Sequence, residues 1–256
     1  MKRLARAVAV AIALAVAGAA AAAPLDPAKI AAINKAAETF LAIGKDAYRT
    51  GKPPRQADPE VAPLLDTIFD LDPVNVGGPV PLADFDKLAD WVAAVAAVGM
   101  VYTFAGTGIA DMARPPDDKQ REQMSRNAIA YSAELGRFYD AALQLQRAGA
   151  DCFMAEIGVH PDQFGSPPAK AFLDANRSAF AQTIGGVIRN FLAPGREPEW
   201  SAARLITINA VAASAAKFLT LRQRHELEGL AGQVANQLGN TVITAGLAKF
   251  AQALAE

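Results

Sequence analysis

Apolar residues recur along most of this chain at the spacing of helices that bury one face. One such stripe begins after Asp26, with Pro27 in the first turn, and ends at Gly51, as the start and stop signals of an α-helix would have it. Similar patterns predict helices over about 60–69, 82–105, 116–148 and 167–192, with two or three more toward the C-terminus. No segment alternates apolar and polar residues as a half-buried strand does. We therefore expect an all-α fold, a single globular bundle of about six to eight helices.

The helix expected over 116–148 has one apolar and one polar side. Its apolar arc contains Met124, Ala128, Tyr131, Leu135, Phe138 and Ala142. These positions lie close together at 100° per residue, so we expect this arc to face the core along the whole helix.

Residues 51–83 form a proline-rich excursion, since seven of the chain's sixteen prolines lie between Pro53 and Pro81. There is room in it for only one short helix, over about 60–69. Loops of this length either carry function or drape over the fold. Draping is favoured by four aliphatic residues that suit packing anchors: Val61, Leu64, Leu65 and Ile68.

The first 22 residues have the three-part layout of a secretory signal peptide: basic residues, a short apolar stretch and small residues. Ala20 and Ala22 suit the cleavage positions, so residues 23–256 are expected to be the exported helical domain. The alternative is an uncleaved membrane anchor, but the apolar stretch is short and dominated by alanine. No cysteine lies near the cleavage position to carry a lipid. The expected location is therefore the periplasm or the medium.

Loss of Lys2, Arg3 and Arg6 with the signal peptide leaves 22 basic and 26 acidic residues, a net charge of −4. This balance argues against nucleic acid as a partner, because phosphates require a concentrated basic face. A single cysteine cannot form an internal disulfide. The hydrophobic core must therefore hold the fold.

Two long apolar stretches, 91–110 and 205–221, raise a membrane alternative. The first is built from alanine, valine and glycine, and Asn209 and Lys217 interrupt the second. We expect both to be central helices of the bundle, because a helix that is apolar all round is buried there as well as in lipid. Stable membrane insertion is the less favoured interpretation.

Cys152, Glu156 and His160 recur every four residues and could form a nucleophilic or metal site. If the segment is helical throughout, Cys152 and His160 are about 12 Å apart along the axis, too far for a thiol and its base. Only a backbone break at Gly158 and Pro161 would bring them together. We expect Cys152 to be a small buried residue with a structural role.

A metal site would need both histidines, His160 with Glu156 and His225 with Glu228. Neither spacing matches the Glu-x-x-His unit of di-iron bundles. The segment RQRHELE is expected to be a solvated, charged turn with local ion pairs. No cofactor or metal is therefore expected.

Gly106 and Gly108 lie in FAGTGIAD, which has a superficial similarity to a phosphate-binding loop. A preceding strand and the full glycine pattern are both missing, so we expect these glycines to end a helix.

Two cations fall on apolar helix faces. Arg177 lies near the centre of the apolar face of the 167–192 helix, where a salt bridge or a snorkelling stem is expected and an anionic ligand is the alternative. Lys217 is the only charged residue from 205 to 221. We expect its stem to carry the ammonium group to the end of the bundle; a carboxylate partner or a cavity for an anionic ligand remains open.

These patterns favour an exported helical protein that binds without catalysing a reaction. The expected partner is a small apolar or anionic ligand, or another protein of the bacterial envelope. Two alternatives stay open: a periplasmic, hydrolase-like enzyme whose site the sequence does not mark, and a membrane-active helical protein built around residues 91–110.

The mature chain is predicted to begin at Ala23, because Ala20 and Ala22 place small side chains at the two positions that the signal peptidase reads. N-terminal sequencing of the exported protein tests this. Recovery of Met1 at the N-terminus of that protein would contradict it.

Overall fold

The computed structural model describes residues 24–75, 79–109, 115–193 and 198–255, and the predicted signal peptide lies outside these ranges. Every regular element in them is helical, as expected: α2 (Pro27–Ile43), α3 (Ala47–Thr50), α4 (Ala62–Ile68), α5 (Asp72–Asn75), η1 (Leu82–Asp84), α6 (Phe85–Thr103), α7 (Asp118–Ala130), α8 (Ser132–Val159), η2 (Pro161–Phe164), α9 (Pro167–Asn190), α10 (Pro198–Phe218), α11 (Leu221–Leu238) and α12 (Thr241–Ala255). Eight of these helices have 13 residues or more. The all-α prediction is therefore confirmed.

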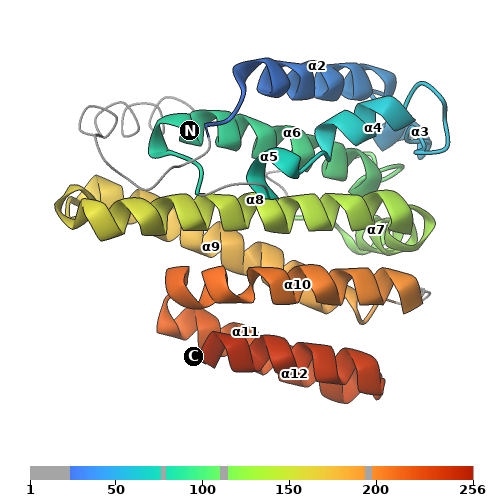
Figure 1. Cartoon of the computed structure of the whole chain (residues 1–256). Helices are drawn as coiled ribbons and strands as arrows, with labels where there is room; N and C mark the ends of the chain where they lie inside the picture. The colour runs from blue at the N-terminus through green and yellow to red at the C-terminus, as the bar shows by residue number, and fades with distance from the viewer. Residues whose placement is uncertain (1–23, 76–78, 110–114, 194–197, 256) are drawn as a thin grey trace.

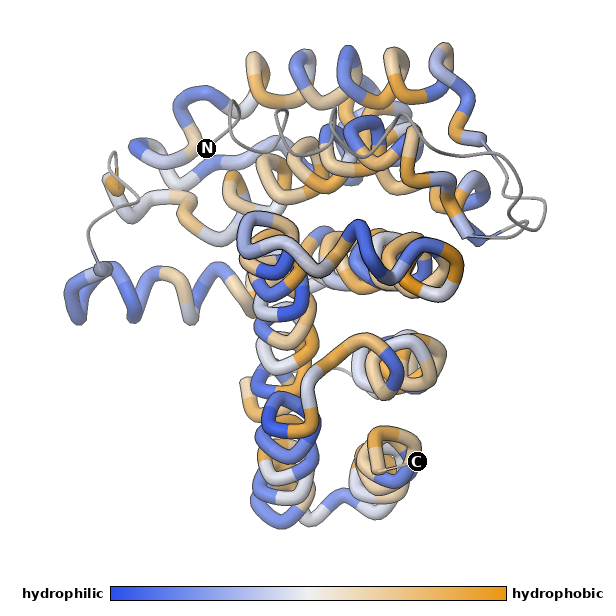
Figure 2. The backbone as a smooth tube through the Cα atoms, turned by 90° about the vertical axis from the view of Figure 1, so that its left-hand side faces the viewer, coloured by the Kyte–Doolittle hydropathy of each residue, from blue (hydrophilic) through white to orange (hydrophobic). Residues whose placement is uncertain are grey.

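The long helices form a stack in the order α2, α6, α8, α10 and α12, and each packs against the next (Figure 1). α9 and α11 form a second layer beside α8, α10 and α12 (Figure 2). α7 extends to one side of the body and is mainly hydrophilic (Figure 2). α6 lies between α2 and α8, and α10 lies between α8 and α12. Both apolar stretches thus supply central helices, as predicted, although the first is helical only to Thr103.

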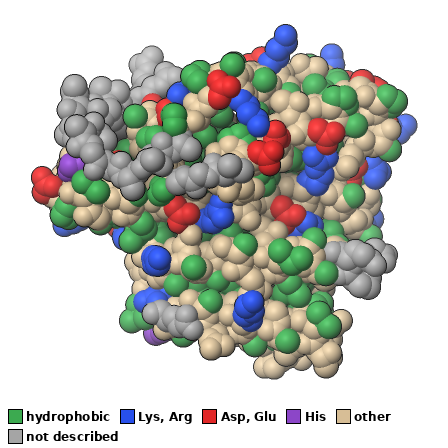
Figure 3. Space-filling model, viewed as in Figure 1, with side chains coloured by type: hydrophobic (Ala, Val, Ile, Leu, Met, Phe, Trp, Pro, Cys, Tyr) green, Lys and Arg blue, Asp and Glu red, His purple; other side chains and the backbone are tan. Residues whose placement is uncertain are grey.

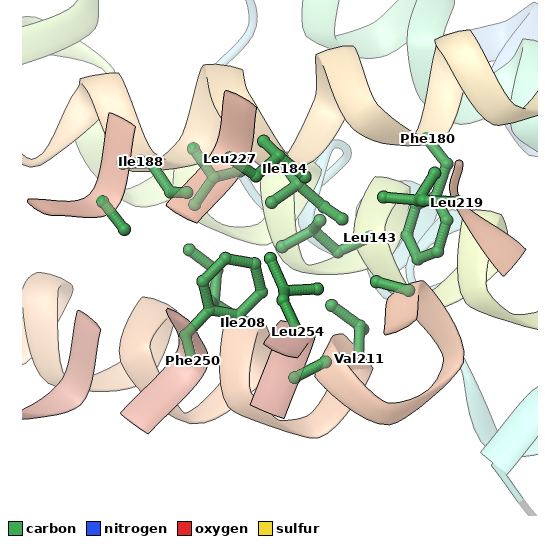
Figure 4. Packing of buried hydrophobic residues seen from close by; sticks show 14 of the residues in the cluster. Leu143, Phe180, Ile184, Ile188, Ile208, Val211, Leu219, Leu227, Phe250 and Leu254 are labelled. Carbon is green, nitrogen blue, oxygen red and sulfur yellow. The ribbon is translucent and has the colours of Figure 1, made fainter. Parts of the chain in front are cut away.

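Two hydrophobic clusters share α8 as their common wall. The N-terminal cluster comes mainly from α2, α4 and α6, and α8 contributes Ala141 and Leu145 to it. The C-terminal cluster comes mainly from α9, α10, α11 and α12, and α8 contributes Leu143 and Ala150. At 100° per residue these two pairs lie on opposite sides of α8. Figure 4 shows Leu143 among the apolar side chains of the C-terminal cluster.

The proline-rich excursion drapes over the N-terminal cluster. Val61, Leu65 and Ile68 are fully buried, and Leu64 packs against the cluster from a partly buried position. The indole of Trp91 in α6 donates a hydrogen bond to the Ile68 carbonyl oxygen at 2.8 Å. The excursion holds a second short helix, α5, that the sequence did not indicate. The aliphatic residues at 61, 64, 65 and 68 act as the predicted packing anchors of the excursion.

The helix expected over 116–148 is in fact two helices. α7 ends at Ala130, α8 begins at Ser132, and α8 continues to Val159, well beyond the predicted end. The break falls at Tyr131, whose hydroxyl donates to the Gly51 carbonyl oxygen at 2.9 Å. The prediction of one continuous apolar arc that faces the core is therefore wrong, because Met124 and Ala128 lie on α7 and are only half-buried.

A buried carboxylate fixes this break to the excursion. Glu134, in the first turn of α8, is 2% exposed. Its Oε1 accepts hydrogen bonds from Arg55 Nε at 3.0 Å and from the Gln56 amide at 3.2 Å. A buried charge requires such partners. Contacts between residues far apart in sequence, rather than a proline or glycine, thus end α7 and start α8.

The first predicted helix also divides. α2 ends at Ile43 and α3 begins at Ala47, with Gly44 between them. A Cβ at Gly44 would lie 3.2 Å from Val101 and 3.3 Å from Pro54, so the absence of a side chain lets α6 and the excursion pack closely here. The predicted stop at Gly51 is confirmed by its left-handed φ of 70°.

A polar cluster joins α8 to α10. The Arg204 guanidinium forms an ion pair with Asp140, and the Thr207 hydroxyl donates to the same carboxylate at 2.7 Å. Gly136 makes room for this arrangement, because a Cβ there would contact the Arg204 guanidinium and lie 3.1 Å from the Trp200 indole nitrogen. Both neighbours are held in place, Arg204 by Asp140 and Trp200 by its hydrogen bond to the Ser132 carbonyl oxygen.

Gly136→Ala is therefore predicted to destabilise the protein by about 1–3 kcal/mol, the usual cost of overpacking a fixed contact. Gly158→Ala is the matched control, since Gly158 is also in α8 and a Cβ added there would have no atom within 4 Å. That control should stabilise by up to about 1 kcal/mol through helix propensity alone. Urea unfolding of both variants measures the difference, and equal effects would contradict the packing described.

Candidate functional site

Cys152 and His160 do not form a catalytic pair. α8 is continuous through Cys152 and ends at Val159, with His160 as its C-cap, so about 12 Å of helix separates the two residues. Cys152 is fully buried. Burial, with smaller contributions from the carboxylates of Glu156, Asp151 and Asp84, raises the pKa of its thiol to about 12. The thiol is protonated at neutral pH, and the predicted structural role agrees with this environment.

The histidine-based metal site finds no support in the described part of the chain. Glu156 is buried while His160 is half-buried at the end of α8, and His225 is exposed on α11. No group of three His, Cys, Asp or Glu side chains among the described residues could hold a metal ion. The RQRHELE segment carries the predicted local ion pair, from Arg222 Nε to Glu226 Oε1 at 2.8 Å.

Gly106 and Gly108 follow the end of α6, and both have left-handed φ angles, of 71° and 66°. Their amides donate to the carbonyl oxygens of Ala47 and Tyr48, each at 2.9 Å. These amides bind the backbone rather than a phosphate, so the predicted helix stop is confirmed.

Arg177 is half-buried and engaged by protein groups. Its Nε donates to the Phe218 carbonyl oxygen at 2.8 Å, and its Nη1 pairs with Asp174 at 3.1 Å. The guanidinium carbon also lies 5.5 Å from the centre of the Phe218 ring. The salt bridge is to an exposed carboxylate on the same helix, so it is not a core salt bridge. Together with the Phe218 carbonyl oxygen it explains Arg177 without a ligand.

Lys217 is exposed, as predicted, and it also lines a cavity. Its side chain is exposed at the last turn of α10, so the stem does carry the ammonium group out of the core. It also lines a cavity of about 540 Å³, within the usual range of small-molecule sites. The other lining residues come from the end of the excursion and from α8: Val74, Asn75, Pro79, Val80, Arg147, Ala148, Asp151, Met154 and Ala155.

This cavity follows from the two-sided burial of α8. Since opposite faces of α8 are covered by the two clusters, its remaining edges are left less covered, and one of them carries Arg147, Asp151 and Met154. The other edge borders a smaller groove of about 360 Å³ between α6 and α9. In Figure 3, acidic and basic side chains occur in neighbouring pairs across α8 on the face shown.

Arg147 links the cavity to the excursion. Its Nη2 donates to the Val74 carbonyl oxygen and to Asn75 Oδ1, both at 3.0 Å. Its Nε is buried, has no hydrogen-bond acceptor among the described residues, and lies 4.0 Å from Asp151 Oδ2. A buried N–H without an acceptor costs about 1–3 kcal/mol. The cavity lining therefore combines one cation that is held by the excursion, Arg147, with a second cation, Lys217.

The sequence pattern did not indicate Arg147 or Asp151. The predicted helix ended at Ala148, whereas α8 continues to Val159 and so places the two residues four apart on one edge. Lys217 was identified because it is the only charge in its apolar stretch. An i,i+4 cation–carboxylate pair next to an apolar turn is the signal that could have completed the site.

Comparison of the chain with protein-family models, with curated proteins and with solved structures found no match. None of the described helices combines the length and hydropathy that a bilayer crossing requires.

Because its pKa is raised to about 12, the Cys152 thiol is predicted to resist alkylation by iodoacetamide from pH 7 to pH 9, since the thiolate forms only near pH 12. The same thiol should react fully in denaturant. Fast labelling of the native protein that rises across this pH range would show an accessible, reactive thiol instead.

Cys152→Ala should cost about 1–3 kcal/mol in unfolding free energy through lost packing.

Proposed function

We propose that this protein is an exported helical binding protein, which holds a small ligand in the cavity between α8, the end of the excursion and the end of α10. The single observation that carries the proposal is the joint presence of two cations, one carboxylate and six apolar residues around one cavity of about 540 Å³. Ligand sites in proteins combine apolar walls with a few convergent polar groups in this way.

Binding is favoured over catalysis by the character of the groups at the cavity. Arg147, Asp151 and Lys217 can attract and orient a charged molecule. A nucleophile needs an adjacent base, and the cysteine that the sequence offered is buried in α8 with its thiol protonated. The proposed location outside the cytoplasm rests on the signal peptide predicted over residues 1–22.

Native mass spectrometry of the protein purified from its own periplasm is the test, with Ala155→Trp as the variant that fills the cavity. Ala155 is half-buried and lines the cavity, so the indole should displace a ligand seen as added mass on the natural protein. Ala133→Trp is the matched control, because Ala133 is exposed on the first turn of the same helix. It should keep the adduct.

Retention of the adduct by Ala155→Trp would place the ligand elsewhere. A natural protein that never carries added mass would leave the binding function itself without support.

A further inference from the structure

We infer that the ligand of this cavity is an amphipathic monoanion, a molecule with one negatively charged head group and a hydrocarbon portion. The inference rests on the proposed function and adds the ligand's chemical class. Arg147 and Lys217 contribute two positive charges to the cavity lining and Asp151 contributes one negative charge. The lining therefore has a single net positive charge, which one anionic group neutralises.

The hydrogen bonds of Arg147 argue against a phosphate-like dianion. An arginine grips phosphate through two parallel N–H groups, and both unhindered edges of the guanidinium include Nη2. Here Nη2 already donates to the Val74 carbonyl oxygen and to Asn75 Oδ1. The Nε–H of Arg147 is closed to solvent. Arg147 can therefore attract a head group by its charge, but it cannot form the two-pronged contact.

Asp151 reduces the positive charge of the lining. Its carboxylate lies 4.0 Å from Arg147 Nε, beyond hydrogen-bond distance. It repels any anion in the cavity, and the lining keeps the net charge that one anionic group neutralises. Lys217 provides a compensating charge that is available, since its ammonium group has no ion pair or hydrogen bond with any described side chain or backbone group.

The rest of the lining favours a hydrocarbon portion. Six of the ten lining residues are apolar: Val74, Pro79, Val80, Ala148, Met154 and Ala155. Val80 and Ala148 are already buried. An alkyl chain would gain hydrophobic free energy by covering the other four residues, whereas an inorganic ion would gain none. Met154 suits such a chain because its thioether side chain adapts to irregular apolar surfaces.

Isothermal titration calorimetry of the purified protein with three probes tests the inference: octanoate, which has the charge and the chain; 1-octanol, which has only the chain; and inorganic phosphate, which has only charge. Octanoate should bind saturably at one site. It should bind at least about fivefold more tightly than 1-octanol, the effect of one charge pair near a surface. Phosphate should not bind measurably.

Charge variants separate the roles of the two groups around the cavity. Lys217→Met should lower the affinity for octanoate about five- to tenfold and leave the affinity for 1-octanol unchanged. Asp151→Asn should raise the affinity for octanoate by a similar factor. Lys249→Met is the control, because Lys249 is an exposed lysine on α12 that does not line the cavity. This variant should bind octanoate and 1-octanol with the affinities of the natural protein.

Equal affinity for octanoate and 1-octanol, tighter binding of phosphate, or an unchanged octanoate affinity in Lys217→Met would overturn the inferred ligand class. If octanoate fails to bind while the native adduct is still lost in Ala155→Trp, the cavity remains the proposed ligand site and only the inferred ligand class is wrong. If octanoate binds equally well to Ala155→Trp, the cavity itself is not the site, and the proposed function fails with it.

Discussion

The structure depends on the burial of two opposite faces of one helix, α8. Both clusters pack against α8: the N-terminal cluster includes its Ala141 and Leu145, and the C-terminal cluster includes its Leu143 and Ala150. A helix that serves two cores cannot slide or rotate to improve one without exposing the other, because protein interiors are close-packed. The edges of α8 between the clusters are where polar groups and cavities can occur, and both are found there.

Polar groups on α8 fix how the two halves of the protein meet this helix. Glu134 binds the excursion through Arg55, Asp140 binds α10 through Arg204, and Arg147 binds the end of the excursion at Asn75. Buried or half-buried charges of this kind add little net stability, but an unpaired one is strongly unfavourable. They therefore specify the register of each neighbour. The pairing is incomplete at two of these groups, since Glu134 Oε2 and Arg147 Nε have no hydrogen-bond partner among the described residues.

Local signals account for what the sequence predicted correctly. The start of α9 after Ser166, the buried Ile68 of the excursion and the exposed Lys217 follow from capping, apolar spacing and the length of a lysine stem. The break at Tyr131 could not be predicted in the same way. It is made by a hydrogen bond to Gly51, a residue 80 positions away, and no proline or glycine marks it. Because the boundaries of α8 were missed, its two-sided burial and the cavity beside Arg147 were missed with them.

The coupling of the two clusters through α8 can be measured with the chain's two tryptophans, one in each cluster: Trp91 in the N-terminal cluster and Trp200 in the C-terminal cluster. The variants Trp91→Phe and Trp200→Phe each leave one fluorescent reporter. If α8 is a shared wall, the fluorescence curve of each variant should coincide with the loss of helical circular dichroism measured on the same variant in urea, as for a single cooperative transition. A fluorescence transition clearly separated from the loss of helix in either variant would contradict the account, because one half of the protein would then unfold while the other kept α8.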